Sequence, residues 1–154
     1  MALVKTIISN GIKAMVDTNP STTAAAAAQI AALYNAYALT ALAGVLPPAL
    51  LPAGLATLTG SLTAIFTATQ PSGVPMATVY GTGCTAFWLA PPVIFAPGVV
   101  TAVAGTAALI AQLTMLFSTP NDKDAYANGL ADALDTFTKT VVVTIPPGVT
   151  VNLS

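Results

Sequence analysis

Two aspartates, Asp132 and Asp135, are the residues best placed for acid–base chemistry, because they lie three positions apart in a predicted helix and can approach one another. General acid–base catalysis needs titratable groups held close together. The chain contains no His, no Glu and no Arg, so no partner group appears elsewhere in the sequence. We therefore interpret both carboxylates as part of a solvated helix face, and we expect no catalytic residues and no enzyme.

Three other motifs have a chemical interpretation that their surroundings do not support. The segment GTGCTA at 81–86 matches a dinucleotide-binding glycine pattern, but the acidic residue expected about twenty positions later is missing. Residues 122–124 resemble the start of a calcium loop without its glycine and its final glutamate, and helix capping explains them better. Cys84 has no cationic neighbour to activate it and is expected to be a small buried residue. We expect no cofactor and no metal.

Charge is scarce and unevenly placed along the chain. Charged residues make up 6% of the sequence, against about 25% in a typical soluble domain, and none lies between Asp17 and Asp122. The four lysines are confined to the two ends, so they cannot form the basic patch that a nucleic-acid backbone requires, and we expect no nucleic-acid partner. Most of the surface is therefore predicted to face lipid or protein instead of water.

Hydrophobic periodicity and capping residues predict a mainly α-helical single domain, a helical bundle with a short C-terminal β segment. Helices are expected over 3–16, 21–43, 54–69, 105–118 and 121–139. Gly44 is placed to end the second of these. In the last, Asn121-Asp122 supplies the N-cap and an apolar stripe runs from Tyr126 to Phe137.

Prolines divide the chain into units. Pro20, Pro71 and Pro120 are about 50 residues apart, and each begins an Ala/Thr-rich stretch that ends in a Pro-Pro pair followed by Gly. This pattern predicts an internal repeat within the domain 1–154. Its parts are an N-terminal helix at 1–18, repeat 1 at 19–69, repeat 2 at 70–118, and a truncated repeat 3 with a β tail at 119–154.

Two apolar segments are candidate interface regions. The segment FWLAPPVIFAPG, from Phe87 to Gly98, is predicted to connect two elements, and its aromatic residues can serve either as core or as interface anchors. Residues 140–153 are β-branched and alternating, which predicts a small hairpin or a strand that pairs with another chain; we favour the second. The candidate interface residues are Phe87, Trp88, Val93, Ile94, Phe95, Val141, Val143, Ile145, Val149 and Val151.

Two functional classes compete. The first is a non-enzymatic structural subunit of a large multi-copy assembly, held by apolar helix packing and by C-terminal strand pairing with other copies or other subunits. The alternative is a small integral membrane protein with Ala/Thr-rich helices, since residues 98–117 form an uncharged stretch of near-spanning length. The uncharged segments lack flanking Lys or Arg and are cut by prolines, which weakens this alternative.

A resemblance to a known family indicates which kind of multi-copy assembly the chain would belong to. The segment YANGLADALDTFTKTVVVTIPPG, from Tyr126 to Gly148, resembles small Ala-rich virion proteins of tailed bacteriophages, in which a helix leads into a Thr/Val strand near the C-terminus. The start Met1-Ala2-Leu3, leading into a short amphipathic helix, adds to the likeness. The resemblance covers about a quarter of the chain. It implies a head, neck, tail or baseplate component of a virion assembled in the host cytoplasm, and it brings no catalytic residues.

Overall fold

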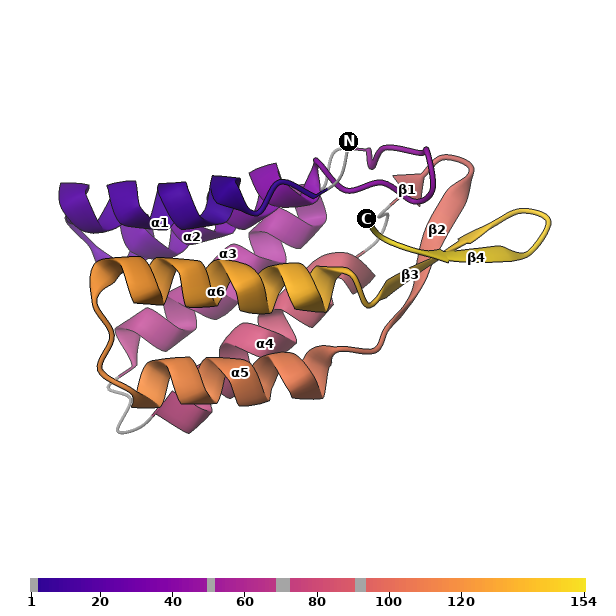
Figure 1. Cartoon of the computed structure of the whole chain (residues 1–154). Helices are drawn as coiled ribbons and strands as arrows, with labels where there is room; N and C mark the ends of the chain where they lie inside the picture. Colours follow the sequence, from indigo (N-terminus) through magenta and orange to yellow (C-terminus); the bar gives the residue numbers. More distant parts are fainter. Residues whose placement is uncertain (1–2, 50–51, 69–72, 91–93) are drawn as a thin grey trace.

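The fold is a bundle of helices with a small antiparallel sheet at one end (Figure 1). The computed structural model describes residues 3–49, 52–68, 73–90 and 94–154. Within these residues the helices are α1 (Thr6–Thr18), α2 (Thr23–Ala38), α3 (Pro52–Thr67), α4 (Gly73–Leu89), α5 (Thr106–Ser118) and α6 (Lys123–Thr138). The strands are β1 (Ile94–Phe95), β2 (Gly98–Val103), β3 (Val141–Ile145) and β4 (Val149–Asn152).

The helices form a closed bundle, because each packs against its neighbours in the sequence and α6 packs against α1. The sheet extends from one end of this bundle, and the C-terminal end of the chain lies near it (Figure 1). The buried side chains of all six helices and of the strands form one continuous core. The prediction of a mainly helical fold with a C-terminal β segment is confirmed.

Local capping explains where two helices begin. The Thr22 side chain accepts a hydrogen bond from the backbone N–H of Ala25 at 3.0 Å, and the Asp122 carboxylate accepts one from Ala125 at 2.7 Å. The predicted N-cap of the last helix is therefore confirmed. The predicted end of the second helix is wrong, because α2 stops at Ala38 and Gly44 lies in a later turn with φ +66°.

The remaining helix bounds agree closely with the predicted ones, with one omission. The helices expected at 3–16, 54–69 and 105–118 correspond to α1, α3 and α5, although Thr69 lies outside the described residues. Helix α4 was not predicted. Its sequence is rich in Gly, Thr and Val, which are weak helix formers in isolation, so tertiary packing on both sides decides its conformation.

The sheet is antiparallel throughout, with the order β1-β2-β3-β4. Strand β3 lies between β2 and β4, with Val143 paired to Val100 on one side and to Val151 on the other. The predicted pairing of residues 140–153 with another chain is therefore corrected for β3, since both of its edges are used within the chain. The hairpin alternative describes the β3–β4 pair.

The internal repeat is not confirmed, because corresponding Pro-Pro pairs occupy different structures. Pro47 and Pro48 lie in a loop between α2 and α3, whereas Pro146 and Pro147 form the turn between β3 and β4. The third pair, at 91–92, lies outside the described residues. The segment 98–117, considered as one uncharged stretch, divides into strand β2 and most of helix α5.

Candidate interaction surface

The aromatic residues predicted as interface candidates belong to the core. Phe87, Trp88 and Phe95 are all 0% exposed. The Trp88 ring lies edge-on to Phe87 with centroids 5.3 Å apart and stacks on Phe95 at 6.4 Å. Their assignment to an interface between chains is therefore corrected, because the helices of one chain already cover them.

The strand residues among the candidates divide between core and surface. Val141 and Val143 are fully buried within the chain, which corrects their assignment as well. Ile145 and Val151 are half-buried, and Val149 is 56% exposed. Of the two remaining candidates, Val93 lies outside the described residues, and Ile94 is placed only as part of strand β1. Of the strand residues predicted to form an interface, those on β4 are therefore still accessible at the surface of the sheet.

A buried polar network holds the core around Trp88. The Trp88 indole N–H donates to the Tyr34 hydroxyl at 2.9 Å, and that hydroxyl lies 3.0 Å from the hydroxyl of Thr138. Thr138 in turn donates to the backbone carbonyl of Leu134 at 2.8 Å. Burial raises the pKa of Tyr34 well above its ordinary value, so the phenol stays neutral. These bonds join α2, α4 and α6 at one point in the interior.

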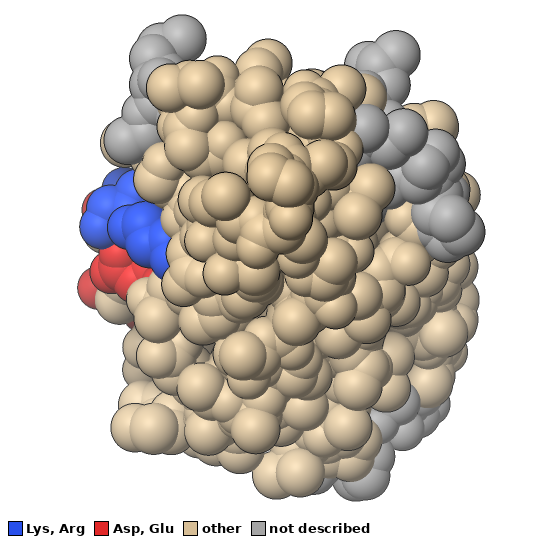
Figure 2. Space-filling model, turned by 90° about the vertical axis from the view of Figure 1, so that its right-hand side faces the viewer, with Lys and Arg blue, Asp and Glu red and all other residues tan. Residues whose placement is uncertain are grey.

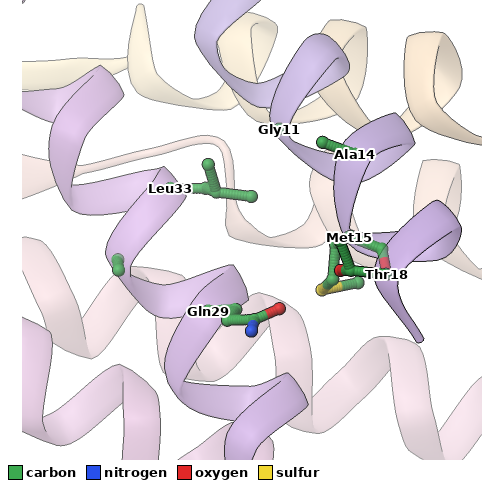
Figure 3. A pocket seen from close by; sticks show the side chains of 7 residues that line it. Gly11, Ala14, Met15, Thr18, Gln29 and Leu33 are labelled. Atoms are coloured by element: carbon green, nitrogen blue, oxygen red, sulfur yellow. The ribbon is translucent and has the colours of Figure 1, made fainter. Parts of the chain in front are cut away.

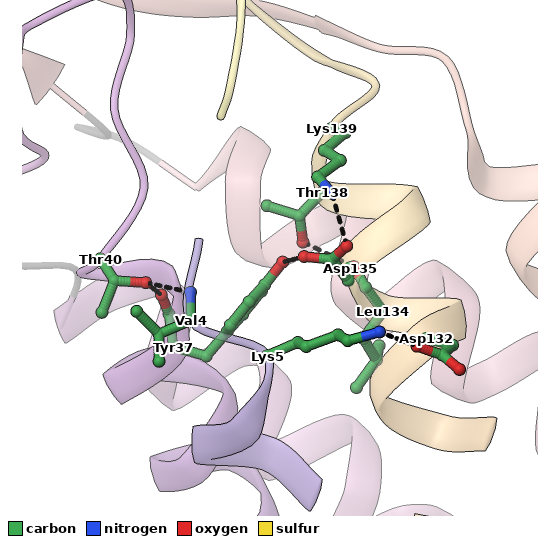
Figure 4. A network of polar contacts seen from close by, with 9 residues as sticks. All are labelled: Val4, Lys5, Tyr37, Thr40, Asp132, Leu134, Asp135, Thr138 and Lys139. Atoms are coloured by element: carbon green, nitrogen blue, oxygen red, sulfur yellow. Dashed lines mark hydrogen bonds and ion pairs between the residues drawn. The ribbon is translucent and has the colours of Figure 1, made fainter. Parts of the chain in front are cut away.

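The carboxylates of Asp132 and Asp135 have separate structural roles (Figure 4). Asp135 is only 9% exposed and accepts a hydrogen bond from the Tyr37 hydroxyl at 2.8 Å, while its other oxygen pairs with Lys139 at 2.7 Å. Asp132 is exposed and pairs with Lys5 at 2.6 Å. The interpretation of both as a solvated face is correct for Asp132 and wrong for Asp135. Burial and the hydrogen bond to Asp135 raise the pKa of Tyr37 above its ordinary value.

The other sequence motifs are accounted for by helix packing. Gly81 and Gly83 lie in the middle of α4, where they let Ile110 of α5 and Ser61 of α3 approach the helix backbone closely. The dinucleotide-like pattern is thus a pair of packing positions in a helix. Cys84 is buried in the core, and burial raises the pKa of its thiol above the ordinary range. The prediction that Cys84 is a buried small residue is confirmed.

All charged residues lie in or directly beside α1 and α6, and nearly all are paired with one another. Besides Lys5–Asp132 and Lys139–Asp135, the pairs are Lys13–Asp124 at 3.0 Å and Lys123–Asp17 at 2.7 Å. Among the described residues, Asp122 is the only charged side chain outside these pairs, and it caps α6. Figure 2, which views the sheet end, shows charged atoms only along one edge, with an uncharged surface beside them.

The outward faces of α3, α4 and α5 are therefore uncharged, and that of α3 consists largely of small residues. On α3 the exposed positions include Ala56, Gly60 and Ala64, which are four residues apart and lie on one side of the helix. Thr57 and Thr67 on the same helix donate their hydroxyl hydrogens to the carbonyls of Ala53 and Thr63. Such threonines offer few free donors to water, so this surface is weakly polar.

A groove of about 440 Å³ lies between α1 and α2 (Figure 3). Its walls are mainly apolar, with Gln29 as the one amide among them. Gly11 forms part of the wall because Leu33 of α2 packs directly against its backbone. The groove lies on the charged side of the molecule, close to Asp17, but none of the charged residues lines it. Its residues are Gly11, Ala14, Met15, Thr18, Gln29, Ala32 and Leu33.

Residues 3–49, 52–68, 73–90 and 94–154 include neither a candidate membrane span nor a candidate metal cluster. No helix among them combines the length and the apolar character needed to cross a bilayer. The same part of the chain holds no cluster of three or more His, Cys, Asp or Glu side chains with the spacing of a metal site.

Comparisons with known proteins identify no homologue of this chain. No family model matches this sequence, and neither the curated proteins nor the solved structures include a significant match.

Proposed function

We propose that this chain is a non-enzymatic structural subunit of a large multi-copy assembly. The observation that carries the proposal is the distribution of charge: all nine charged residues lie in or beside α1 and α6, and four lysines pair with four aspartates. The rest of the surface carries no charge. The resemblance of residues 126–148 narrows the assembly to a tailed-bacteriophage virion, with the chain as a head, neck, tail or baseplate component.

The physical argument concerns what such a surface does in water. A soluble domain usually carries about a quarter to a third of its surface as charged residues of both signs, which keeps copies apart. Here the lysines and aspartates neutralise one another on one side, so neither net charge nor local charge opposes contact elsewhere. Large apolar residues such as Val45 (86% exposed) and Met115 (73% exposed) lie on the uncharged surface. A surface of this kind is typical of obligate interfaces, where other subunits cover it.

The small residues on α3 support close packing by a neighbour. Ala56, Gly60 and Ala64 leave the helix backbone accessible, and nothing lies within 4 Å of the position that a Cβ would take at Gly60. A helix or sheet of another subunit can therefore approach α3 closely, as in other helix contacts built on small residues. We propose this face and the sheet end as the two parts of the molecule that other subunits cover.

Expression of the chain alone, followed by separation of membranes from soluble material, tests the proposal. We expect the chain alone to become polydisperse as its concentration rises, and to form a defined large particle when it is co-expressed with the products of the genes that flank its own. A monodisperse monomer at high concentration that joins no particle in co-expression would contradict the proposal. Material that enters membranes and leaves them only in detergent would favour the integral membrane alternative.

A further inference from the structure

Strand β4 presents unpaired backbone groups at the free edge of the sheet. Leu153 donates to the carbonyl of Val141, so Leu153 and, by alternation, Val151 and Val149 direct their backbone groups toward β3. Ser154 directs its groups the opposite way, where its N–H and C=O both bond to Leu42. Thr150 and Asn152 have the same parity as Ser154, and both are exposed. Their N–H and C=O groups therefore point outward, and no partner for them occurs among the described residues.

This edge lacks the features that usually protect edge strands. Proteins block exposed edges with Lys, Pro, bulges or covering loops. Residues 149–152 contain no charge and no proline, and their pairing with β3 is regular. The opposite edge differs, since β1 is two residues long, Pro91 and Pro92 precede it in the sequence, and Pro97 lies in the turn that follows it. The single bulge of the sheet lies between Val100 and Ala102 in β2, away from β4.

The backbone of β4 specifies its occupant. Outward N–H and C=O groups that alternate along an extended chain are matched by another extended chain, so the occupant is a β-strand. Its side chains would meet Val149 and Val151 on one face of the sheet and Thr150 and Asn152 on the other. The matching strand therefore alternates apolar residues with small uncharged polar ones.

A second copy of β4 does not fit this position. A two-fold antiparallel pair of β4 strands can place Thr150 opposite Asn152, Thr150 opposite Thr150, or Asn152 opposite Asn152. The first and the third place Gly148 or Thr150 of one copy opposite Ser154 of the other. The second places Gly148 opposite Asn152, but the Gly148 N–H is already bonded to the Ile145 carbonyl in the hairpin turn. The outward groups of Ser154 are already bonded to Leu42, whose chain occupies that space. Pairing with β1 of another copy is opposed by the prolines beside β1. The strand must therefore come from a different polypeptide.

We propose that the edge of β4 from Val149 to Asn152 is a strand-addition site for an uncharged, alternating β-strand of a different subunit. This inference deepens the proposed function and rests on it, because it names the partner that the uncharged sheet end receives. The Thr150 and Asn152 backbone groups make the contact, and β4 becomes an inner strand of a sheet shared between subunits.

Amide hydrogen exchange, measured by NMR on the isolated full chain at a concentration at which it is monodisperse, tests the site. The probe is a ten-residue peptide of alternating Thr and Val with one Lys at each end, in which alternate backbone nitrogens are methylated so that only one edge can pair. In the free chain we expect fast exchange at Thr150 and Asn152 and slower exchange at Val151 and Leu153. With the peptide at ten times its Kd, exchange at Thr150 and Asn152 should slow by about tenfold.

Matched variants separate the backbone edge from the side chain. Thr150→Ala keeps the N–H and should bind the peptide as the parent chain does. Thr150→Pro removes an outward N–H without breaking a bond to β3, and it should abolish the slowing at Asn152. Asn152→Pro removes the other outward N–H. It is used in place of Thr150→Pro if the near-ultraviolet circular dichroism spectrum of Thr150→Pro differs from that of the parent chain.

Four outcomes would overturn the proposal. These are slow exchange at Thr150 and Asn152 in the free chain, no slowing at millimolar peptide, equal binding by the Ala and Pro variants, and slowing that follows protein concentration without peptide. The last would assign the edge to a second copy of the chain. The peptide experiment uses the isolated chain, so it can fail while co-expression still yields a particle. In that case the assembly stands and only the strand-addition site is lost.

Discussion

Replacing either of two glycines in α3 by alanine should change the stability of the chain, but in opposite directions. A Cβ at Gly54 would lie 2.5 Å from the backbone carbonyl oxygen of Phe87 and 3.1 Å from its ring, whereas a Cβ at Gly60 would have nothing within 4 Å. The obstacle at Gly54 is backbone, which cannot rotate away, so α3 and α4 must separate. Gly54→Ala should therefore destabilise the chain, and Gly60→Ala should stabilise it.

The magnitudes follow from two opposing effects. Replacing Gly by Ala inside a helix gains up to about 1 kcal/mol, and overpacking a well-packed contact costs about 1–3 kcal/mol. With a backbone obstacle the cost is near the upper end, so Gly54→Ala should lower the free energy of unfolding by about 2 kcal/mol. Gly60→Ala should raise it by about 0.5–1 kcal/mol. For a chain of this length each kcal/mol shifts Tm by about 2–4 °C.

Urea denaturation followed by tryptophan fluorescence is the suitable assay, because Trp88 is the single tryptophan and is fully buried. The parent chain and the two variants should unfold with the same dependence on urea concentration and with midpoints in the order Gly54→Ala, parent, Gly60→Ala. A Gly54→Ala variant as stable as the parent would refute the close approach of α3 to α4 at Phe87. A Gly60→Ala variant less stable than the parent would show that this face of α3 is covered within the chain.

Three further predictions concern buried polar groups. Tyr34→Phe leaves the buried Trp88 N–H without its acceptor and should cost about 1–3 kcal/mol in urea denaturation, whereas Tyr80→Phe removes a buried hydroxyl with no partner among the described residues and should be neutral or stabilising. Cys84 should not react with a thiol reagent at pH 8 until urea unfolds the chain, and labelling of the folded chain would contradict its burial. Burial raises the pKa of Tyr34, Tyr80 and Cys84 above their ordinary values of 10.0 for tyrosine and 9.0 for cysteine. Near and above these ordinary values, the groups therefore keep their protons in the folded chain but lose them in the unfolded chain. Stability should be constant from pH 6 to 8 and fall as pH rises beyond about 9; a urea midpoint unchanged at pH 10.5 would contradict this.

The structure also changes how the C-terminal segment should be tested. The sequence alone, which favours pairing of residues 140–153 with another chain, would suggest deleting residues 140–154 as the test. Val141 and Val143 are instead part of the core, so the deletion would unfold the protein whatever the segment does in an assembly. A change at Thr150 affects only the free edge, which makes it the more specific test.

The sequence by itself determined the class of the molecule and much of its local structure. Periodic apolar positions and capping residues such as Asp122 are local signals, so they predicted most of the helices and the final β segment. The scarcity of charge is a property of composition, and it predicted an uncharged surface before any fold was known. The fold class could therefore be read from residues close together in the chain.

Only the tertiary structure decided which apolar and polar residues are covered. FWLAPPVIFAPG reads equally well as core or as interface, and the packing of helices from distant parts of the chain places Phe87, Trp88 and Phe95 inside. Asp135 looks solvated on its own helix, but it meets Tyr37, which is 98 residues away. Strand β3 likewise pairs with β2, about 40 residues earlier in the chain, and this leaves β4 at an edge of the sheet. Contacts between distant segments depend on how whole elements pack, and no local pattern records that.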